Sequence, residues 1–431
     1  MPRFESVALL KDREFAALAG TAFARSQAYS TILIALALYA DLYQTTGFVE
    51  GLFGTAFAIV QLVIVLPLGR KVDTGNAKRY LLAGFLVNVV VFVGFIFVDS
   101  AVHVVLIRMV QGLGASILWI TGSTIVGEIS PDRAQGLWLG SYNQVAAFSS
   151  LLGDLLGGYL LYAYGFTIPY LVLTVITLGS FFLVYAFLRD DPGGQTDAEE
   201  TGGLEAFRSL LGLPTLRALV GFRFAFSFGK MAVIIFLPIY ARTSFGISAF
   251  AIGWIMAGGK LTKSMLQGFV GTLTDRSDHE YRFVAVGALL YGIGTALIPL
   301  AATFDGTIEP VRVALLGDVQ VLGGAFFTLF GAYSLIGVAD SIRLPASMSL
   351  FVDEGERYDS VASAMSLRSI SWKVGQVLGP VLVGSTMDYV STEAGFYLAA
   401  GFITVATGAY AIFARRAYRR DSMRSDLDVD G

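Results

Sequence analysis

Long runs of apolar residues recur along the chain and alternate with short polar segments. The runs are apolar on every side, whereas a transmembrane β-strand alternates apolar and polar residues over about 10 positions. A bilayer core of about 30 Å requires about 20 apolar residues per helix. The pattern therefore predicts an all-α polytopic membrane protein with twelve transmembrane helices, at residues 15–41, 50–68, 80–98, 103–127, 136–162, 168–188, 216–240, 249–270, 283–302, 324–352, 361–389 and 394–414.

Composition narrows the functional classes. Of the 431 residues, 55% are hydrophobic and 15% are charged, whereas soluble proteins contain about 25% charged residues. This excludes a soluble globular enzyme, a disordered protein and a collagen-like fibre. Because the sequence has no cysteine and only two histidines, His103 and His279, we expect no disulfide, no metal site and no cofactor. Nothing indicates a nucleic-acid partner.

The basic residues between the predicted spans indicate the orientation, because cytoplasmic loops carry an excess of Lys and Arg. With the N-terminus inside, nineteen Lys and Arg residues fall in inner segments and only Arg242 and Arg312 fall in outer loops. The asymmetry predicts an even number of spans and two cytoplasmic termini. We expect the protein to lie in the inner (cytoplasmic) membrane of the cell.

A polar segment at 189–215, rich in Gly, Thr and acidic residues, divides the predicted spans into two groups of six. We interpret it as a cytoplasmic linker between an N-terminal half at 1–188 and a C-terminal half at 216–414, which is followed by a cytoplasmic tail at 415–431. Parallel six-helix repeats are one known transporter architecture.

The two halves echo one another in sequence. Tyr39 and Tyr240 end similar stretches at an offset near 202, and Gly153 and Gly379 align at an offset of 226. The second half therefore carries an insertion of about two dozen residues. We place it at 303–323 and expect an outer loop with a short interfacial helix.

Three motifs contain glycines next to charged or polar residues. The first lies in the loop after the second predicted span and is echoed after the eighth; its residues are Gly69, Asp73, Lys78 and Arg79, with Gly271, Asp275 and Arg276 in the echo. The second lies in the fourth span, at Arg108, Gln111, Gly112 and Gly114. The third lies in the fifth span, at Ser149, Gly153, Asp154, Gly157 and Gly158, and the eleventh span has Gly375, Gly379, Pro380 and Gly384.

Over nearly its whole length the sequence resembles the major facilitator superfamily, and its closest branch is similar to the drug:proton antiporters. The resemblance implies two pseudo-symmetric six-helix halves and close helix packing at Gly153, Gly157, Gly158, Gly375, Gly379 and Pro380. The sequence departs from the family pattern in two places: the arginine that usually follows Asp73 is absent, and Asp154 stands where proline is usual.

For the first motif, the resemblance implies a cytoplasmic latch that holds one conformation. A carboxylate on such a loop caps a helix N-terminus and pairs with basic residues. The latch residues are Gly69, Asp73, Arg79, Gly271, Asp275 and Arg276, with Glu128 and Arg133 as partners. The alternative is a basic loop that only sets the topology.

Asp154 is the most informative residue, because a carboxylate within the bilayer is rare and marks a functional site by default. The resemblance implies that the fifth span packs against the eighth across the two halves. At 1.5 Å per residue, Asp154 lies about 12 Å and Lys260 about 16 Å from the outer ends of these spans, so their depths are compatible. We hypothesise that Asp154 pairs with Lys260 or Lys263, joins the halves and is the protonated site. A static salt bridge without a coupling role is the alternative.

Spans 1, 4, 7 and 10 line the cavity in the family, and they carry further ionisable residues. The resemblance implies a proton-coupling role for Arg108, although backbone carbonyls could hold it as a structural arginine instead. Asp340 joins the proton-coupling candidates. The predicted substrate-cavity residues are Arg25, Lys230, Arg343, Trp119, Tyr142 and Phe226, of which each aromatic has simple packing as its alternative.

These observations indicate a secondary transporter that exports a small amphipathic organic compound in exchange for protons, by alternating access. We expect lipids, protons and the organic substrate as partners, and a monomer. Import or exchange of an organic anion and a lipid or lysolipid flippase remain alternatives. The sequence has no P-loop, which argues against a primary pump. We expect no enzyme, because the sequence has no G-x-S-x-G motif.

Overall fold

The structure is a computed structural model that describes residues 8–131, 134–190, 210–274, 280–315, 318–357 and 361–429. Within these ranges, the side chains of residues 73, 272, 315, 318, 361–362 and 416–429 are left out of the description. The first half begins with η1 (Leu9–Lys11) and contains six long helices: α2 (Arg13–Leu42), α3 (Gly47–Thr74), α4 (Ala77–Ile96), α5 (Ala101–Ile129), α6 (Gln135–Tyr164) and α7 (Thr167–Phe187).

The second half also contains six long helices in the described ranges, with a short helix and two strands between them. Its elements are α9 (Pro214–Phe245), α10 (Ala249–Thr274), α11 (Glu280–Leu297), α12 (Leu300–Phe304), β1 (Val311–Leu315), β2 (Asp318–Leu322), α13 (Gly324–Glu356), α14 (Val361–Tyr389) and α15 (Thr392–Val429). The all-α prediction is confirmed, and each predicted span coincides largely with one long helix. Eight of the helices are apolar and long enough to cross a membrane, by length and composition over the described residues.

Several helix limits follow from local chemistry. Asp12 and Asn76 accept hydrogen bonds from backbone N–H groups in the first turns of α2 and α4, as side-chain N-caps do. Gly165 and Gly246 end α6 and α9 with positive φ angles of 66° and 63°, which glycine adopts without steric penalty. Polar and glycine residues between apolar runs therefore determine where these helices begin and end.

Two predictions about the second half were wrong. The predicted span at 283–302 is divided, because α11 ends at Leu297 and α12 begins at Leu300, with Pro299 between them. The insertion at 303–323 forms an antiparallel hairpin in which Val311 pairs with Leu322 and Val313 with Gln320. Alternating β-branched residues favour strands over an interfacial helix.

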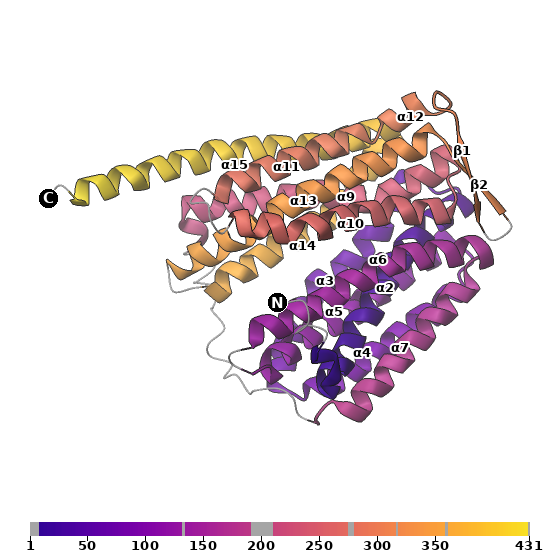
Figure 1. The fold of residues 1–431 in the computed structure, drawn as a ribbon, viewed down its shortest axis with the longest axis horizontal. Coiled ribbons are helices and arrows are strands. Elements are labelled where there is room, and N and C mark those ends of the chain that lie inside the picture. Colours follow the sequence, from indigo (N-terminus) through magenta and orange to yellow (C-terminus); the bar gives the residue numbers. More distant parts are fainter. Residues whose placement is uncertain are drawn as a thin grey trace.

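The twelve long helices form two bundles, α2–α7 and α9–α15, which Figure 1 shows converging toward the β1–β2 hairpin and separating toward the opposite end. We call these ends the hairpin end and the linker end, since α7 leads toward α9 at the latter. The bundles meet along a seam, in which α3 contacts α14, α6 contacts α10, and α2 contacts α9.

The surroundings of the seam glycines show how the distance between the two bundles changes from the hairpin end to the linker end. An added Cβ at Gly47 would lie 2.5 Å from the Gly384 carbonyl oxygen, and one at Gly158 would lie 2.6 Å from that of Ala249. Nearer the linker end of the same helices, an added Cβ at Gly140 or Gly268 would meet nothing within 4 Å. The bundles therefore touch backbone to backbone at the hairpin end and separate toward the linker end.

Candidate functional site

A central cavity of about 290 Å³ lies between the two bundles. Both halves contribute to its wall, which combines aromatic rings with amide and basic groups. The lining residues are Arg25, Ser26, Ala28, Tyr29, Phe57, Gln61, Asn88, Gln111, Ala115, Trp119, Ser150, Met231, Ile234, Trp372, Lys373 and Gln376. A wall of rings with a few convergent polar groups is typical of a small-molecule site.

Two cations lie in this wall. Lys373 is 8% exposed, and its Nζ donates to Gln61 Oε1 from the opposite half and to Gln376 Oε1 at 3.3 Å. The buried Nε of Arg25 has no hydrogen-bond partner. Trp119, which is 46% exposed, lies beside Lys373, with its ring centroid 5.5 Å from Nζ. Thus Arg25 and Trp119, both expected from the sequence, line the cavity, together with a lysine that was not among the predicted cavity residues.

Arg108 is buried, and its guanidinium contacts neutral groups. Its Nε donates to the Phe53 carbonyl at 2.8 Å, one terminal nitrogen donates to Gln111 Oε1 at 2.6 Å, and the guanidinium lies 4.4 Å from the Phe57 ring centroid. No carboxylate forms a salt bridge with it in the described part of the chain. These contacts favour the structural interpretation, and a coupling role for Arg108 stays a prediction.

Asp154 and Lys260 meet across the seam. Asp154 on α6 is fully buried, and Lys260 Nζ on α10 lies 2.6 Å from its Oδ2. The same Nζ donates to Ser30 Oγ at 2.7 Å and to the Ser150 carbonyl at 3.3 Å. One lysine of the second half therefore contacts α2 and α6 of the first half.

Asp340 on α13 has three cationic partners. Lys230 and Lys263 donate to its Oδ2 at 2.6 and 2.9 Å, and Arg343 donates to its Oδ1 at 2.8 Å. All three cations belong to the second half. Lys263 is thus placed with Asp340 and not with Asp154, which leaves Lys260 as the partner of Asp154.

Four predicted cavity residues do not line the central cavity. Lys230 and Arg343 are held by Asp340 as described above. Tyr142 is 1% exposed, and its hydroxyl lies against Gly122, so it packs inside the first half. Phe226 is also 1% exposed and contacts Arg343, whose guanidinium lies 3.9 Å from the ring centroid. The helix faces that these residues occupy are turned into their own bundles.

The packing glycines lie at close approaches. Gly153 and Gly157 of α6 face Gln27 and Thr31 of α2, and Gly375 and Gly379 of α14 face the α9 backbone. Pro380 of α14 lies against Gly51 of α3, across the seam.

The predicted latch lies at the linker end and is only partly described. Gly69 and Gly271 have no neighbour within 4 Å of an added Cβ, and Arg79 and Glu128 are exposed. Arg133, Asp275, Arg276 and the side chain of Asp73 lie outside the described residues. The latch therefore stays a prediction.

At the linker end, a salt bridge between two charged residues joins two segments of the first half. Arg189 donates to Glu14 through Nε at 2.8 Å and through a terminal nitrogen at 2.5 Å. This hydrogen-bonded guanidinium lowers the pKa of Glu14 and, reciprocally, Glu14 raises the pKa of Arg189. The pair joins the start of α2 to the segment that follows α7.

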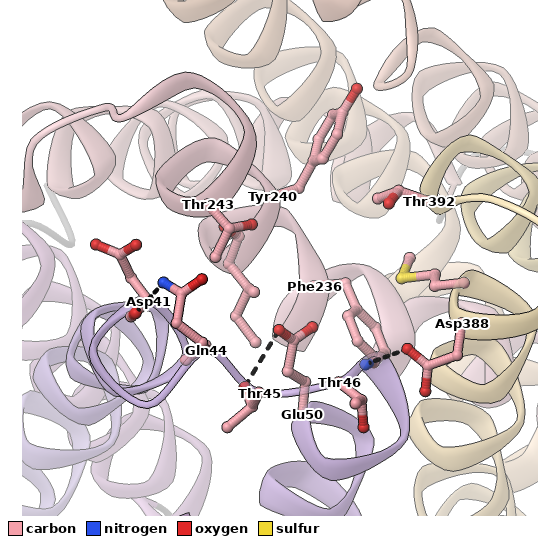
Figure 2. Close-up of a pocket in the computed structure, with 14 residues that line it drawn as sticks. Asp41, Gln44, Thr45, Thr46, Glu50, Phe236, Tyr240, Thr243, Asp388 and Thr392 are labelled. Atoms are coloured by element: carbon pink, nitrogen blue, oxygen red, sulfur yellow. Dashed lines mark hydrogen bonds between the residues drawn. The ribbon is translucent and has the colours of Figure 1, made fainter.

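A second pocket, of about 270 Å³, lies where the halves meet at the hairpin end, and Figure 2 shows its polar residues. The carboxylate of Asp388 on α14 accepts hydrogen bonds from Gly47 N at 2.5 Å and from Phe48 N at 2.8 Å. It therefore caps the N-terminus of α3 in the other half. Beside it, Arg242 of α9 donates to Asp41 of α2 at 2.8 Å, so two polar contacts close this end.

Sequence reasoning missed Gln61, Gln376 and Trp372 as cavity residues. Uncharged amides and an indole within apolar spans gave the signal, since buried polar groups need partners. To place these residues in the cavity, one must know how each helix is rotated about its axis, and helix packing determines that rotation. In the described part of the chain, no cluster of three or more His, Cys, Asp or Glu residues could hold a metal ion.

Comparisons with known proteins agree with this architecture. The family model of the Major Facilitator Superfamily matches residues 18–229 and again 219–426. The uncharacterised MFS-type transporter YuxJ of Bacillus subtilis is 26% identical over 399 residues, which cover 90% of this chain and 94% of the relative. The multidrug resistance protein MdtG of Dickeya zeae is 24% identical over 393 residues, which cover 89% of this chain and 90% of the relative.

Among solved structures, the fold is similar to that of a bacterial homologue of the human lysosomal transporter Spinster in an inward-facing and unoccupied conformation. The TM-score is 0.71 at 15% identity, with 93% of this chain and 96% of the other chain covered. At this identity the likeness concerns the fold alone. The two matches of the family model, 18–229 and 219–426, largely coincide with the two bundles that enclose the cavity.

Proposed function

Because the chain belongs to the Major Facilitator Superfamily and is a multi-pass membrane protein, we propose that it is a secondary transporter that exports a small amphipathic organic compound in exchange for protons. The central cavity carries this proposal, because both halves line it and it combines aromatic with polar groups. The similarity to a multidrug resistance protein supports a small organic cargo and export.

The geometry of the seam supports alternating access. The halves touch at the hairpin end and separate at the linker end, so the described conformation is open toward the linker end. The excess of basic residues in the linker-side loops supports a cytoplasmic location for that end and for both termini. Rocking of one half against the other would open the hairpin end and close the linker end around the cavity, with the predicted latch closing the linker end.

Proton coupling is assigned to the pair of Asp154 and Lys260. Asp154 is fully buried and its partner lysine belongs to the other half. Protonation of the carboxylate removes the charge that attracts Lys260, which weakens a contact between the halves and favours their rearrangement. Asp340, with three cations around one carboxylate, is the second proton-coupling candidate, and its partners all lie within one half.

The test uses purified full-length protein in proteoliposomes with an imposed pH gradient. The probes are 1-naphthoate, 1-naphthamide and 1-naphthylmethylammonium, which share one ring system. We expect the gradient to drive accumulation of at least one probe above the level in protein-free liposomes. Asp154→Asn should abolish this accumulation and preserve probe exchange without a gradient, whereas Asp305→Asn at the exposed hairpin end should change neither.

Two outcomes contradict the proposal at different levels. Full gradient-driven accumulation in the Asp154→Asn variant would show that Asp154 has no coupling role. If the wild-type protein accumulates none of the probes in either gradient direction, the proposed transport of small amphipathic compounds is wrong.

A further inference from the structure

The interior cations differ in whether they have a carboxylate partner. Lys260 contacts Asp154, and Lys230, Lys263 and Arg343 contact Asp340. Arg25 and Lys373 form no such ion pair in the ranges that the structure describes, and both line the central cavity. Their surplus charge therefore faces the space in which a transported compound would bind.

The immediate partners of these two cations are neutral. Lys373 Nζ donates to two amide oxygens, those of Gln61 and Gln376, and the Nε of Arg25 donates to no described group. A cation that is removed from water and left without a counter-charge is unfavourable. The lining residues include no Asp or Glu, so the wall itself supplies no compensating charge.

We propose that the transported compound is a small organic anion whose negative group is bound by Lys373 and Arg25. This inference rests on the proposed transport function and names its substrate class. A carboxylate accepts charge-assisted hydrogen bonds from both cations, which are stronger than those that the amides accept. An organic cation of the same shape would face two like charges and no acidic group.

The other residues of the cavity wall indicate the shape and polarity of the uncharged part of the compound. Trp119, Trp372 and Tyr29 bring flat apolar surfaces to the cavity, and Trp119 lies beside Lys373. Rings bind flat apolar groups with a gain beyond simple burial. The volume of about 290 Å³ lies at the lower limit for ligand pockets. The expected substrate is therefore a compact aromatic or cyclic compound with one anionic group.

Binding of the three naphthalene probes to the purified full-length protein in detergent tests the charge preference. We expect naphthoate to bind about 10- to 100-fold more tightly than naphthamide, which is the range for a hydrogen bond to a charged group. Naphthylmethylammonium should bind most weakly. Titration calorimetry and the shift in melting temperature measure the affinities, since a ligand of the native state raises that temperature.

Variants of the two cations test whether they are the source of the preference for the anionic probe. Lys373→Gln and Arg25→Gln should each lower naphthoate affinity about 10-fold and leave naphthamide affinity nearly unchanged, and Lys373→Arg should restore the preference. Lys11→Gln, an exposed site outside the cavity, removes the same charge and should have no effect. If a variant fails to fold, the wild-type probe series still decides the sign of the preferred charge.

The inference is overturned if the ammonium probe binds as tightly as naphthoate, if naphthoate does not bind, or if its preference survives in both glutamine variants. Gradient-driven accumulation of the ammonium probe alone would refute the anion and support transport. Binding of naphthoate in detergent, combined with no accumulation of any probe in proteoliposomes, would refute transport and support the anion site.

Discussion

Asp154 and Asp340 are both buried carboxylates, and their partners belong to different parts of the molecule. Asp154 has one lysine, which comes from the opposite half. Asp340 has two lysines and an arginine, all from its own half. Motion between the halves changes the surroundings of Asp154 directly, whereas the Asp340 cluster can move as one unit. The comparison separates a contact suited to coupling from one suited to holding a bundle together.

The largest expected effect is a difference in the free energy of unfolding between variants of the two carboxylates. Asp340→Asn leaves three cations without their shared counter-charge, and breaking a buried charge network costs about 3–5 kcal/mol. Asp154→Asn leaves one lysine, which keeps Ser30 and Ser150 as acceptors, so its cost is about 1–3 kcal/mol. Unfolding of the purified variants in detergent measures both, with Asp305→Asn as the control. Equal or reversed costs would remove the distinction.

A smaller effect is expected at the hairpin end, where Asp388 makes another contact between the halves. Asp388→Ala removes the cap of α3, and such a loss costs about 1 kcal/mol, or about a fivefold change in the population of the closed end. Because the protein has no cysteine, Ile235→Cys introduces a single thiol beside Gly54 in the seam. We expect an impermeant maleimide, added from the hairpin side, to label it faster in the Asp388→Ala background.

The matched control for this measurement is Asp99→Ala. Asp99 lies at the same end, is exposed and pairs with His103 four residues later on the same side of the seam. Its loss should leave the labelling rate unchanged. Equal rates in the Asp388→Ala variant and its parent would mean that the cap does not hold the hairpin end closed.

The smallest effect is expected for a contact that lies within one half and near solvent. Arg189 lowers the pKa of Glu14, so the ionised pair stabilises the fold above the unfolded-state value of about 4.3. This contribution is lost as pH falls through the lower pKa of the folded state. Since Arg189 is 56% exposed and Glu14 is 22% exposed, Glu14→Gln should cost less than about 1 kcal/mol at pH 7.

Unfolding midpoints of the wild-type protein and Glu14→Gln, measured from pH 7 down to pH 3, check this prediction. The difference should shrink at the acidic end, and gradient-driven transport should be unaffected. The exposed Glu309→Gln variant is the control. A difference that keeps its size at pH 3 would show that the carboxylate charge is not responsible.

The sequence was sufficient for the fold because apolar runs of about 20 residues are a strong local signal. It also placed Asp154 and Lys260 at similar depths, since helical rise converts residue number into height, and the structure brings them together. It did not separate Lys260 from Lys263, because that choice depends on helix rotation. Rotation follows from packing partners far away in sequence, such as those of Tyr142 and Phe226.

Long-range polar contacts were not predictable for the same reason. The bond from Lys373 to Gln61 joins residues 312 positions apart, and the cap from Asp388 to Gly47 joins residues 341 positions apart. Each requires that α3 and α14 lie side by side. The hairpin at 311–322 has the alternating pattern of strands, but its five-residue strands are short beside the helical spans that flank them.

The glycine contacts at the hairpin end have a consequence for the speed of the proposed rearrangement of the two halves. Where Gly47 meets Gly384 and Gly158 meets Gly253, main chain rests on main chain. Long side chains lose up to about 2 kcal/mol of rotamer entropy when they become ordered, and glycine loses none. Because the glycines themselves have no side chain to order, their separation and return should add little rotamer entropy to the barrier of the proposed rearrangement.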